Sequence, residues 1–272
     1  MQRILATVFA SAFLLASTGI HAAQQTKNMP YDHIHLNVAD PAAASAWYEK
    51  HFGGTRITEG PDRLMYGSTR LLFLRSASAM PSMNSAIDHI SFSVRDVDAT
   101  MKDFQADGVK IEGPVREETG LFKYAFIQDP WGTRIEVIQD PELLGFHHVH
   151  LRAMDPEATF KWLLEKLGGE RTRLKGRLDG VRYSARDYST VWIFIQQGAT
   201  APSTGRAIDH IGWRSTDLKP DIETFRSNGV TIISEPRPLA LANGPSINYA
   251  YIMGPNETRI EIVERPGLAP GK

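Results

Sequence analysis

The chain has 272 residues, of which 42% are hydrophobic and 22% are charged, and its formal net charge is −1. This composition is that of a globular protein with a sizeable core, and it gives no reason to expect nucleic acid or an anionic membrane surface as a partner. The chain contains no cysteine, which excludes disulfides and thiolate ligands, so any bound metal must be held by nitrogen and oxygen.

Residues 1–23 are predicted to be a secretory signal peptide. Arg3 precedes an apolar run that extends from Ile4 to Ile20, and the small residues Ala22 and Ala23 lead into a polar stretch. The run is shorter than the roughly 20 residues that are needed to cross a bilayer. We therefore expect cleavage after Ala22 or Ala23 and a secreted or periplasmic protein that is free of the membrane once the signal is removed.

After this leader the chain repeats one unit, which consists of a strand, a helix and a short run of further strands. In the first unit, residues 31–38 alternate as a strand does, with His33 and His35 on one face. Asp40 and Pro41 then begin a helix that is expected to end at the glycine pair 53–54. The third unit repeats this pattern in register from His148 onward.

The second and fourth units form a second type. Ala86-Ile87-Asp88-His89-Ile90 returns as Ala207-Ile208-Asp209-His210-Ile211, and both units end in an Arg-Ile-Glu strand. This alternation of two unit types predicts a duplicated two-unit domain. We expect one domain over residues 24–140 and another over residues 145–265.

Three ligand-type residues recur at the same places in each half. They are His33, His89 and Glu136 in the first half and His148, His210 and Glu261 in the second. A lone histidine on a strand is more often a core residue than a ligand, but the duplication of the whole set favours a metal site in each half. Two imidazoles and one carboxylate are typical of non-haem Fe(II) and also suit Mn(II) or Zn(II).

Four neighbouring residues have two interpretations. His35 and His150 lie on the same strand faces as the proposed ligands, so they are either pocket groups or buried residues beneath the site. Arg134 and Arg259 precede the two glutamates by two positions, and each either meets an anionic substrate or pairs with a neighbouring carboxylate.

The Asp-His-Ile strand openings and the closing run from Phe126 to Glu136 resemble the vicinal oxygen chelate superfamily, which includes glyoxalases, extradiol dioxygenases and bleomycin-resistance proteins. The resemblance covers about residues 31 to 264. It implies an α+β fold of four βαβββ units, paired into two vicinal-oxygen-chelate domains with curved mixed sheets. The metal is then expected on the concave face of each domain, where oxygens of the substrate complete its shell.

Residue by residue, the resemblance places the fourth, carboxylate ligand of glyoxalases on Leu72 and Ile193, which argues for a three-ligand site. The extradiol dioxygenases have an active-site tyrosine ten positions before the glutamate ligand, and Tyr251 has this place in the second half. Phe126 occupies it in the first half. The resemblance therefore implies a catalytic role for Tyr251 and favours the second-half site.

We expect an exported metal-dependent enzyme, either dioxygenase-like or lyase/isomerase-like, that binds a small oxygen-bearing substrate. Fe(II) or Mn(II) is the favoured ion, and Zn(II) is a further choice. The alternative is a non-catalytic small-molecule binding or sequestering protein of the bleomycin-resistance type. The expected partner is a small-molecule substrate, with no nucleic acid, and the expected assembly is a monomer or homodimer.

Overall fold

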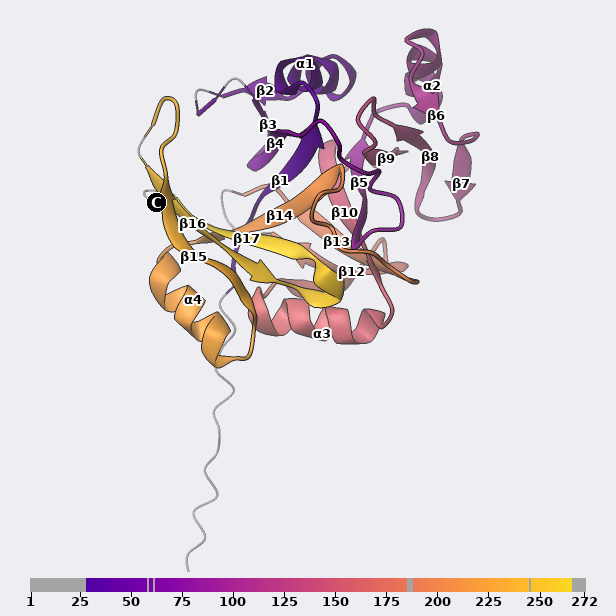
Figure 1. The fold of residues 1–272 in the computed structure, drawn as a ribbon. Helices are drawn as coiled ribbons and strands as arrows, with labels where there is room; N and C mark the ends of the chain where they lie inside the picture. The colour runs from indigo at the N-terminus through magenta and orange to yellow at the C-terminus, as the bar shows by residue number, and fades with distance from the viewer. Residues whose placement is uncertain (1–27, 58, 61, 185–187, 245, 266–272) are drawn as a thin grey trace, which may run out of the picture.

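The computed structural model describes residues 28–57, 59–60, 62–184, 188–244 and 246–265 (Figure 1). The predicted signal peptide lies outside these residues and stays a prediction. None of the described helices is long and apolar enough to cross a membrane.

The four predicted units are all present. The first unit contains β1 (Tyr31–Val38), α1 (Pro41–Phe52), β2 (Thr55–Arg56), β3 (Arg63–Tyr66) and β4 (Thr69–Arg75). The second contains β5 (Ile87–Ser93), α2 (Val97–Ala106), β6 (Lys110–Ile111), β7 (Arg116–Glu118), β8 (Phe122–Gln128) and β9 (Arg134–Ile138). The third contains β10 (Gly145–Ala153), α3 (Pro156–Lys166), β11 (Glu170–Leu174), β12 (Leu178–Tyr183) and β13 (Val191–Gln197). The fourth contains β14 (Ile208–Ser215), α4 (Leu218–Ser227), β15 (Ile232–Leu239), β16 (Ile247–Met253), the 3-10 turn η1 (Pro255–Glu257) and β17 (Arg259–Glu264).

The helix of the first unit begins and ends where local chemistry requires. The Asp40 carboxylate accepts hydrogen bonds from the backbone N–H groups of Ala42 and Ala43, which have no partner within the helix. Pro41 follows at the first helical position. Gly53 ends the helix at a φ of 70°, a conformation that a side chain disfavours.

The strands form two mixed sheets, and each sheet combines one unit from each half of the chain. Within the described residues, one sheet has the order β15-β16-β17-β14-β1-β4-β3-β2. The other has the order β11-β12-β13-β10-β5-β9-β8-β6, with β7 paired to β8. The first unit therefore shares a sheet with the fourth, and the second with the third, as Figure 1 shows for β1 beside β14.

The α+β class with mixed sheets is confirmed, but the predicted pairing of consecutive units is wrong. β1 pairs antiparallel with β14, and β5 pairs antiparallel with β10. The internal repeat defines each unit, but it does not say which copy will be its neighbour, because β1 and β10 present the same alternation to a partner. The sheets consequently do not follow the predicted division into residues 24–140 and 145–265.

The two sheets share one hydrophobic core. Phe52 at the end of α1 stacks on Phe92 of β5, with ring centroids 4.2 Å apart. Tyr31 of β1 and Phe146 of β10 stack across the middle of the molecule at 6.3 Å. Ile34 lies in this core, and alternation along β1 turns the neighbouring histidines to the opposite face. Each sheet thus has one apolar face that packs in the core and an opposite face that carries histidines.

Candidate metal centres

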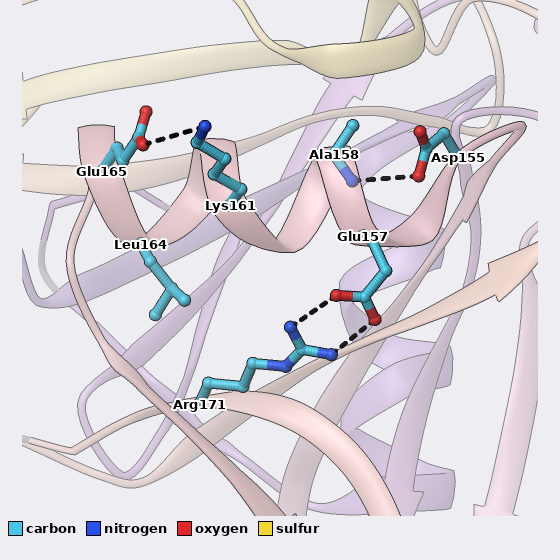
Figure 2. Close-up of a pocket in the computed structure, with 7 residues that line it drawn as sticks. All are labelled: Asp155, Glu157, Ala158, Lys161, Leu164, Glu165 and Arg171. Carbon is cyan, nitrogen blue, oxygen red and sulfur yellow. Dashed lines mark hydrogen bonds and ion pairs between the residues drawn. The ribbon is translucent and has the colours of Figure 1, made fainter.

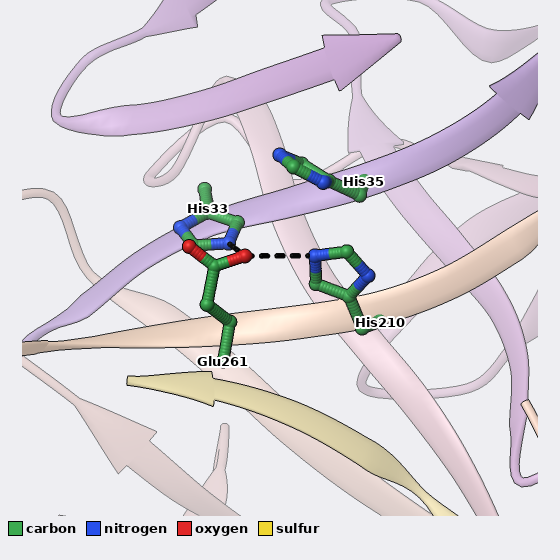
Figure 3. A group of neighbouring side chains, drawn as sticks. All are labelled: His33, His35, His210 and Glu261. Carbon is green, nitrogen blue, oxygen red and sulfur yellow. Dashed lines mark hydrogen bonds and ion pairs between the residues drawn. The ribbon is translucent and has the colours of Figure 1, made fainter. Parts of the chain in front are cut away.

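Two groups of side chains have the composition of a metal site. Group A consists of His33, His35, His210 and Glu261, and group B consists of His89, Glu136, His148 and His150. Within each group the candidate ligand atoms all lie within 4.8 Å of one another. Figure 3 shows group A, in which two histidines come from β1 and the rings and carboxylate point toward one another.

All six predicted ligands belong to these groups, but the structure combines them differently from the predicted triads. His89 and Glu136 of the first half meet His148 of the second. His210 and Glu261 of the second half meet His33 of the first. The predicted combinations of ligands within one half are therefore wrong, because the sheets pair units from opposite halves.

The strand register brings each group together. In one sheet His35 lies opposite His210 across β1 and β14, and in the other His150 lies opposite His89 across β10 and β5. The glutamates lie one strand further out, where Glu261 pairs with Gly212. Side chains that are aligned across neighbouring strands point to the same face, so these residues converge on one side of their sheet.

In group A the Glu261 carboxylate lies between two imidazoles. Its Oε2 is 3.0 Å from His210 Nε2 and 3.5 Å from His33 Nε2. The other ring nitrogen of each histidine is engaged behind the group, where His33 Nδ1 lies 2.9 Å from Asp32 and His210 Nδ1 lies 2.6 Å from Asp209. A carboxylate at Nδ1 fixes the ring tautomer and leaves the Nε2 lone pair for a metal.

Group B has the same plan with one difference. Glu136 Oε2 lies 3.0 Å from His148 Nε2 and 3.4 Å from His89 Nε2. His89 Nδ1 donates to Asp88 at 2.7 Å, but His148 follows a histidine where the others follow an aspartate. His148 Nδ1 lies 2.9 Å from His147 Nδ1, and His147 Nε2 lies 3.3 Å from Asp140. The imidazole of His147 therefore lies between His148 and the Asp140 carboxylate.

Burial and hydrogen bonding show that the donor sets fit a divalent metal. The Nε2 atoms of His33, His89 and His148 are buried and make no hydrogen bond of good geometry, although Glu136 Oε2 lies 3.0 Å from that of His148. Buried polar atoms without a partner are uncommon, and three that converge beside carboxylates suit a cation. Burial acts to raise the pKa of Glu261, but His33 and His210 outweigh it and hold that pKa well below its usual range, so the carboxylate is ionised.

His35 and His150 belong to the groups themselves, a role that the sequence did not predict. Each has a buried Nδ1 without a hydrogen-bond partner. Burial, followed by the neighbouring histidines, lowers the pKa of both rings well below the usual value, so they are neutral and able to coordinate. The sequence signal for this role was their position two residues after a predicted ligand, on the same face of the strand.

The place that the resemblance assigned to a fourth carboxylate is apolar in both sheets. Leu72 pairs with His35 and therefore lies on the face of group A. In the other sheet Phe194 pairs with His150, whereas Ile193 pairs with Val149 and lies in the core. The assignment to Ile193 is therefore wrong by one residue, which on a strand is the difference between the two faces.

Tyr251 lies beside group A. It pairs directly with Glu261 across β16 and β17, and its ring lies edge-on to His210 at 5.1 Å. The Arg259 guanidinium covers the ring at 3.8 Å. Burial, followed by Glu261, raises the pKa of the Tyr251 hydroxyl, which keeps its proton and can donate it in a hydrogen bond.

The two arginines that precede the glutamates pair with carboxylates. Arg134 Nη1 donates to Asp88 at 3.1 Å, and Arg259 Nη1 donates to Asp209 at 2.9 Å. Of the two interpretations, the structure supports the pair with a neighbouring carboxylate. The arginines thereby hold the same aspartates that orient His89 and His210.

A cavity of about 330 Å³ opens over group B. Its walls carry Phe122, Tyr124, Phe126 and Leu178 beside the ligand residues. A larger hollow, of about 600 Å³, lies along α3 (Figure 2). That hollow is lined by paired charges such as Glu157 with Arg171, and none of its lining residues belongs to either metal group. The candidate metal ligands therefore lie on the sheets and away from α3.

The comparisons with known proteins agree with this architecture. Residues 31–137 match the family model of the Glyoxalase/Bleomycin resistance protein/Dioxygenase superfamily. No curated protein matches the sequence significantly.

Among solved structures, the fold is similar to glyoxalase I from Zea mays, with a TM-score of 0.69 and 20% identity over 87% of this chain and 92% of that one. It is also similar to a proposed dioxygenase from Bacillus subtilis, with a TM-score of 0.58 and 20% identity over 89% of this chain and 86% of that one. At these identities the similarity concerns the fold. The resemblance of this chain to the glyoxalase, bleomycin resistance protein and dioxygenase superfamily is thereby confirmed.

Proposed function

We propose that this protein is an exported metal-dependent enzyme with two metal sites, one at group A and one at group B. The observation that carries the proposal is the convergence of buried histidine Nε2 atoms on an ionised glutamate in both sheets, where His33 in group A and His89 and His148 in group B have an Nε2 atom without a hydrogen-bond partner. Histidine and carboxylate ligands favour Fe(II) or Mn(II), and Zn(II) is compatible with the same donors. The substrate is a small molecule that presents oxygen atoms.

The protein residues have two roles in this proposal. His33, His210 and Glu261 hold the ion at group A, with His35 as a fourth donor. When bound, the ion acts as a Lewis acid on oxygen atoms of the substrate. Tyr251 keeps its proton and donates a hydrogen bond to a substrate oxygen on which negative charge develops. This role applies equally to a dioxygenase and to a lyase or isomerase.

A second candidate, sequestration of a small molecule without reaction, is favoured by the aromatic cavity over group B. Aromatic walls bind apolar ligands and need no catalytic group. A protein that only sequesters a small molecule does not need two complete sets of metal donors. We therefore prefer the enzyme. Both groups are complete within one chain, so a monomer or a homodimer would be functional.

Metal analysis of the mature protein, purified without chelator, tests the proposal. We expect about two equivalents of iron or manganese per chain. Oxygen uptake and product analysis with phenolic and keto-acid substrates then separate a dioxygenase from a non-redox enzyme, and Tyr251→Phe should lower kcat more than it lowers metal content. A protein that binds no metal even after reconstitution would contradict the enzyme and favour the binding cup.

Export is tested separately by the mature N-terminus. Mass spectrometry of the protein from a periplasmic or secreted fraction should show a chain that begins after Ala22 or Ala23. An intact N-terminus in the cytoplasmic fraction would overturn the proposed localisation without bearing on the metal sites.

A further inference from the structure

The sheet faces that carry the two metal groups differ in charge at four matching positions. Among the described residues, the face with group A, here called cup A, has four arginines that have no arginine counterpart at the matching positions of the face with group B, called cup B. The cup A arginines are Arg63, Arg70, Arg214 and Arg265, and their counterparts in cup B are Gly180, Trp192, Ser93 and Asp140.

The strand register establishes this correspondence near the ligands. Arg70 pairs with His33 in cup A, and Trp192 pairs with His148 in cup B. Arg63 pairs with Leu72, which in turn pairs with His35.

In cup B the counterpart of Leu72 is Phe194, and its ring fills the space beside a glycine. A Cβ atom at Gly180 would lie 2.5 Å from the Phe194 ring. An aromatic side chain thus takes the space that Arg63 has in cup A.

The other two arginines follow the ligands at equal spacing. Arg214 comes four residues after His210, as Ser93 comes four residues after His89. Arg265 comes four residues after Glu261, as Asp140 comes four residues after Glu136. All four differences replace a cation in cup A by a neutral or acidic residue in cup B.

Within the described part of the chain, the arginines of cup A share few carboxylates. Asp32, which is fully buried, accepts hydrogen bonds from Arg70 at 3.3 Å, from Arg214 at 2.9 Å and from Arg265 at 3.1 Å. Glu59 accepts from Arg70 at 2.7 Å and from Arg265 at 3.1 Å. Both carboxylates are therefore shared by more than one guanidinium.

Arg63 is the least satisfied of the four. Its Nη1 lies 3.5 Å from the already shared Glu59, and its Nε lies 3.6 Å from Asp62, a carboxylate that is 39% exposed. That Nε is buried and has no hydrogen-bond partner.

The cationic excess lies next to the metal group. Arg63 is in the same row of side chains as Leu72, His35 and His210, and neighbouring strands are about 4.8 Å apart. A divalent ion at group A would add further positive charge to this face. Buried positive charge is unfavourable unless an anion compensates it, and a guanidinium binds carboxylate and phosphate oxygens well.

We propose that cup A binds small ligands that carry an oxyanion, a carboxylate or a phosphate, which pairs with Arg63 at the edge of the arginine cluster. Oxygen donors at the other end of the ligand reach the ion at group A, and this second contact rests on the proposed metal sites. Cup B accepts uncharged ligands against its aromatic wall. The two cups of one chain are thus specialised for ligands of different charge.

The test uses a ligand pair that differs only in charge, 3,4-dihydroxybenzoate and 3,4-dihydroxybenzamide. Their vicinal oxygens can both bind a metal, whereas only the acid presents a carboxylate. The corresponding phosphonate distinguishes a preference for phosphate-type groups. Calorimetric titration of the Glu136→Ala protein reports on cup A. Titration of the Glu261→Ala/Arg63→Met protein, which lacks both the group A ligand and the Arg63 guanidinium, reports on cup B, and each protein is loaded with Mn(II).

In cup A the acid or the phosphonate should bind about tenfold more tightly than the amide, and Arg63→Met should remove most of this difference. The matched control is Arg56→Met, because Arg56 is exposed in a pair with Glu49 and should leave the preference unchanged. Cup B should show no preference for the anions. Equal preference in the two cups, or a preference in cup A that survives Arg63→Met in a protein of unchanged thermal stability, would overturn the inference.

Titration of the metal-free wild-type protein separates this inference from the proposed function. The arginines do not depend on the ion, so the anions should still bind more tightly than the amide, although all ligands bind more weakly. A protein that takes up no metal but keeps this preference would contradict the metal sites alone. A protein that binds metal without any such preference would contradict the cup specialisation alone.

Discussion

At the residue scale, the amino acid that precedes each ligand histidine decides how its ring is held. Asp32, Asp88 and Asp209 each place a carboxylate at the Nδ1 of the next residue. His148 is preceded by His147 and reaches a carboxylate only through that second imidazole. The sequence shows this difference directly, but only the structure shows that group A has two carboxylate-held histidines and group B has one.

Removing one of these carboxylates should weaken metal binding. Asp209→Asn keeps the shape of the side chain but removes the charge that holds the His210 tautomer. We expect the affinity of group A for its metal to fall by about 10- to 100-fold, as is usual for such partners. The control is Asp98→Asn. Asp98 lies in an exposed pair with Lys123, so this substitution should leave the metal affinity of group A unchanged. Competition against a metal-binding dye measures the metal affinity of both variants. Equal affinities in Asp209→Asn and Asp98→Asn would contradict the role of Asp209.

Asp129 makes the stability of the fold depend on pH. Burial raises the pKa of this carboxyl to about 6, although Tyr48 and the backbone of Thr133 and Trp131 act to lower it. A carboxyl whose pKa is higher in the folded state binds more protons there, so its contribution to stability is present below the unfolded value near 4 and is lost as the pH rises toward 6.

Asp129→Asn should therefore gain stability relative to the wild type between pH 4 and pH 7. The upper limit is about 3 kcal/mol, since a tenfold change in proton affinity corresponds to about 1.4 kcal/mol. Urea unfolding of both proteins across this range gives the difference. If the difference in unfolding free energy between the two proteins were the same at every pH, Asp129 would not titrate between pH 4 and pH 7.

At the element scale, the strands place the ligands through register and close approach. β1 has a register shift between Tyr31 and His33, and it brings the His33 ring against the backbone of β14. A Cβ atom added at Gly212 would lie 2.1 Å from that ring. The strands and most helix starts could be predicted from alternation and capping residues. The register could not, since a slip of one residue, as at Ile193 and Phe194, leaves the local pattern unchanged.

Gly212→Ala should displace His33 and lower metal binding at group A. The added methyl group takes space that the imidazole now fills, so His33 must leave its bond to Asp32 or its approach to Glu261. The matched change in the other sheet is Ser91→Ala, because Ser91 pairs with His148 as Gly212 pairs with His33. The Ser91 hydroxyl has no hydrogen-bond partner, so group B should keep its metal. Metal content after dialysis distinguishes the two variants, and equal content would contradict the steric argument.

At the scale of the whole molecule, the chain crosses between sheets twice. It leaves the first sheet after β4, builds the second with β5 to β13, and returns with β14. The identities of the six predicted ligands could be read from the repeat, but their combinations could not, because two copies of one unit offer the same edge to two possible partners. The pairing depends on contacts such as Tyr31 with Phe146, which lie far apart in the sequence.

The arrangement of ligands across the two halves is the central claim, and metal content of two double variants tests it most directly. In His33→Ala/Glu261→Ala both changes fall in group A, so one equivalent of metal should remain at group B. In His33→Ala/Glu136→Ala the changes fall in both groups, and stoichiometric metal should be lost from both. The opposite result, with metal retained only in the second variant, would show that each half of the chain builds its own site and would contradict the cross-half groups.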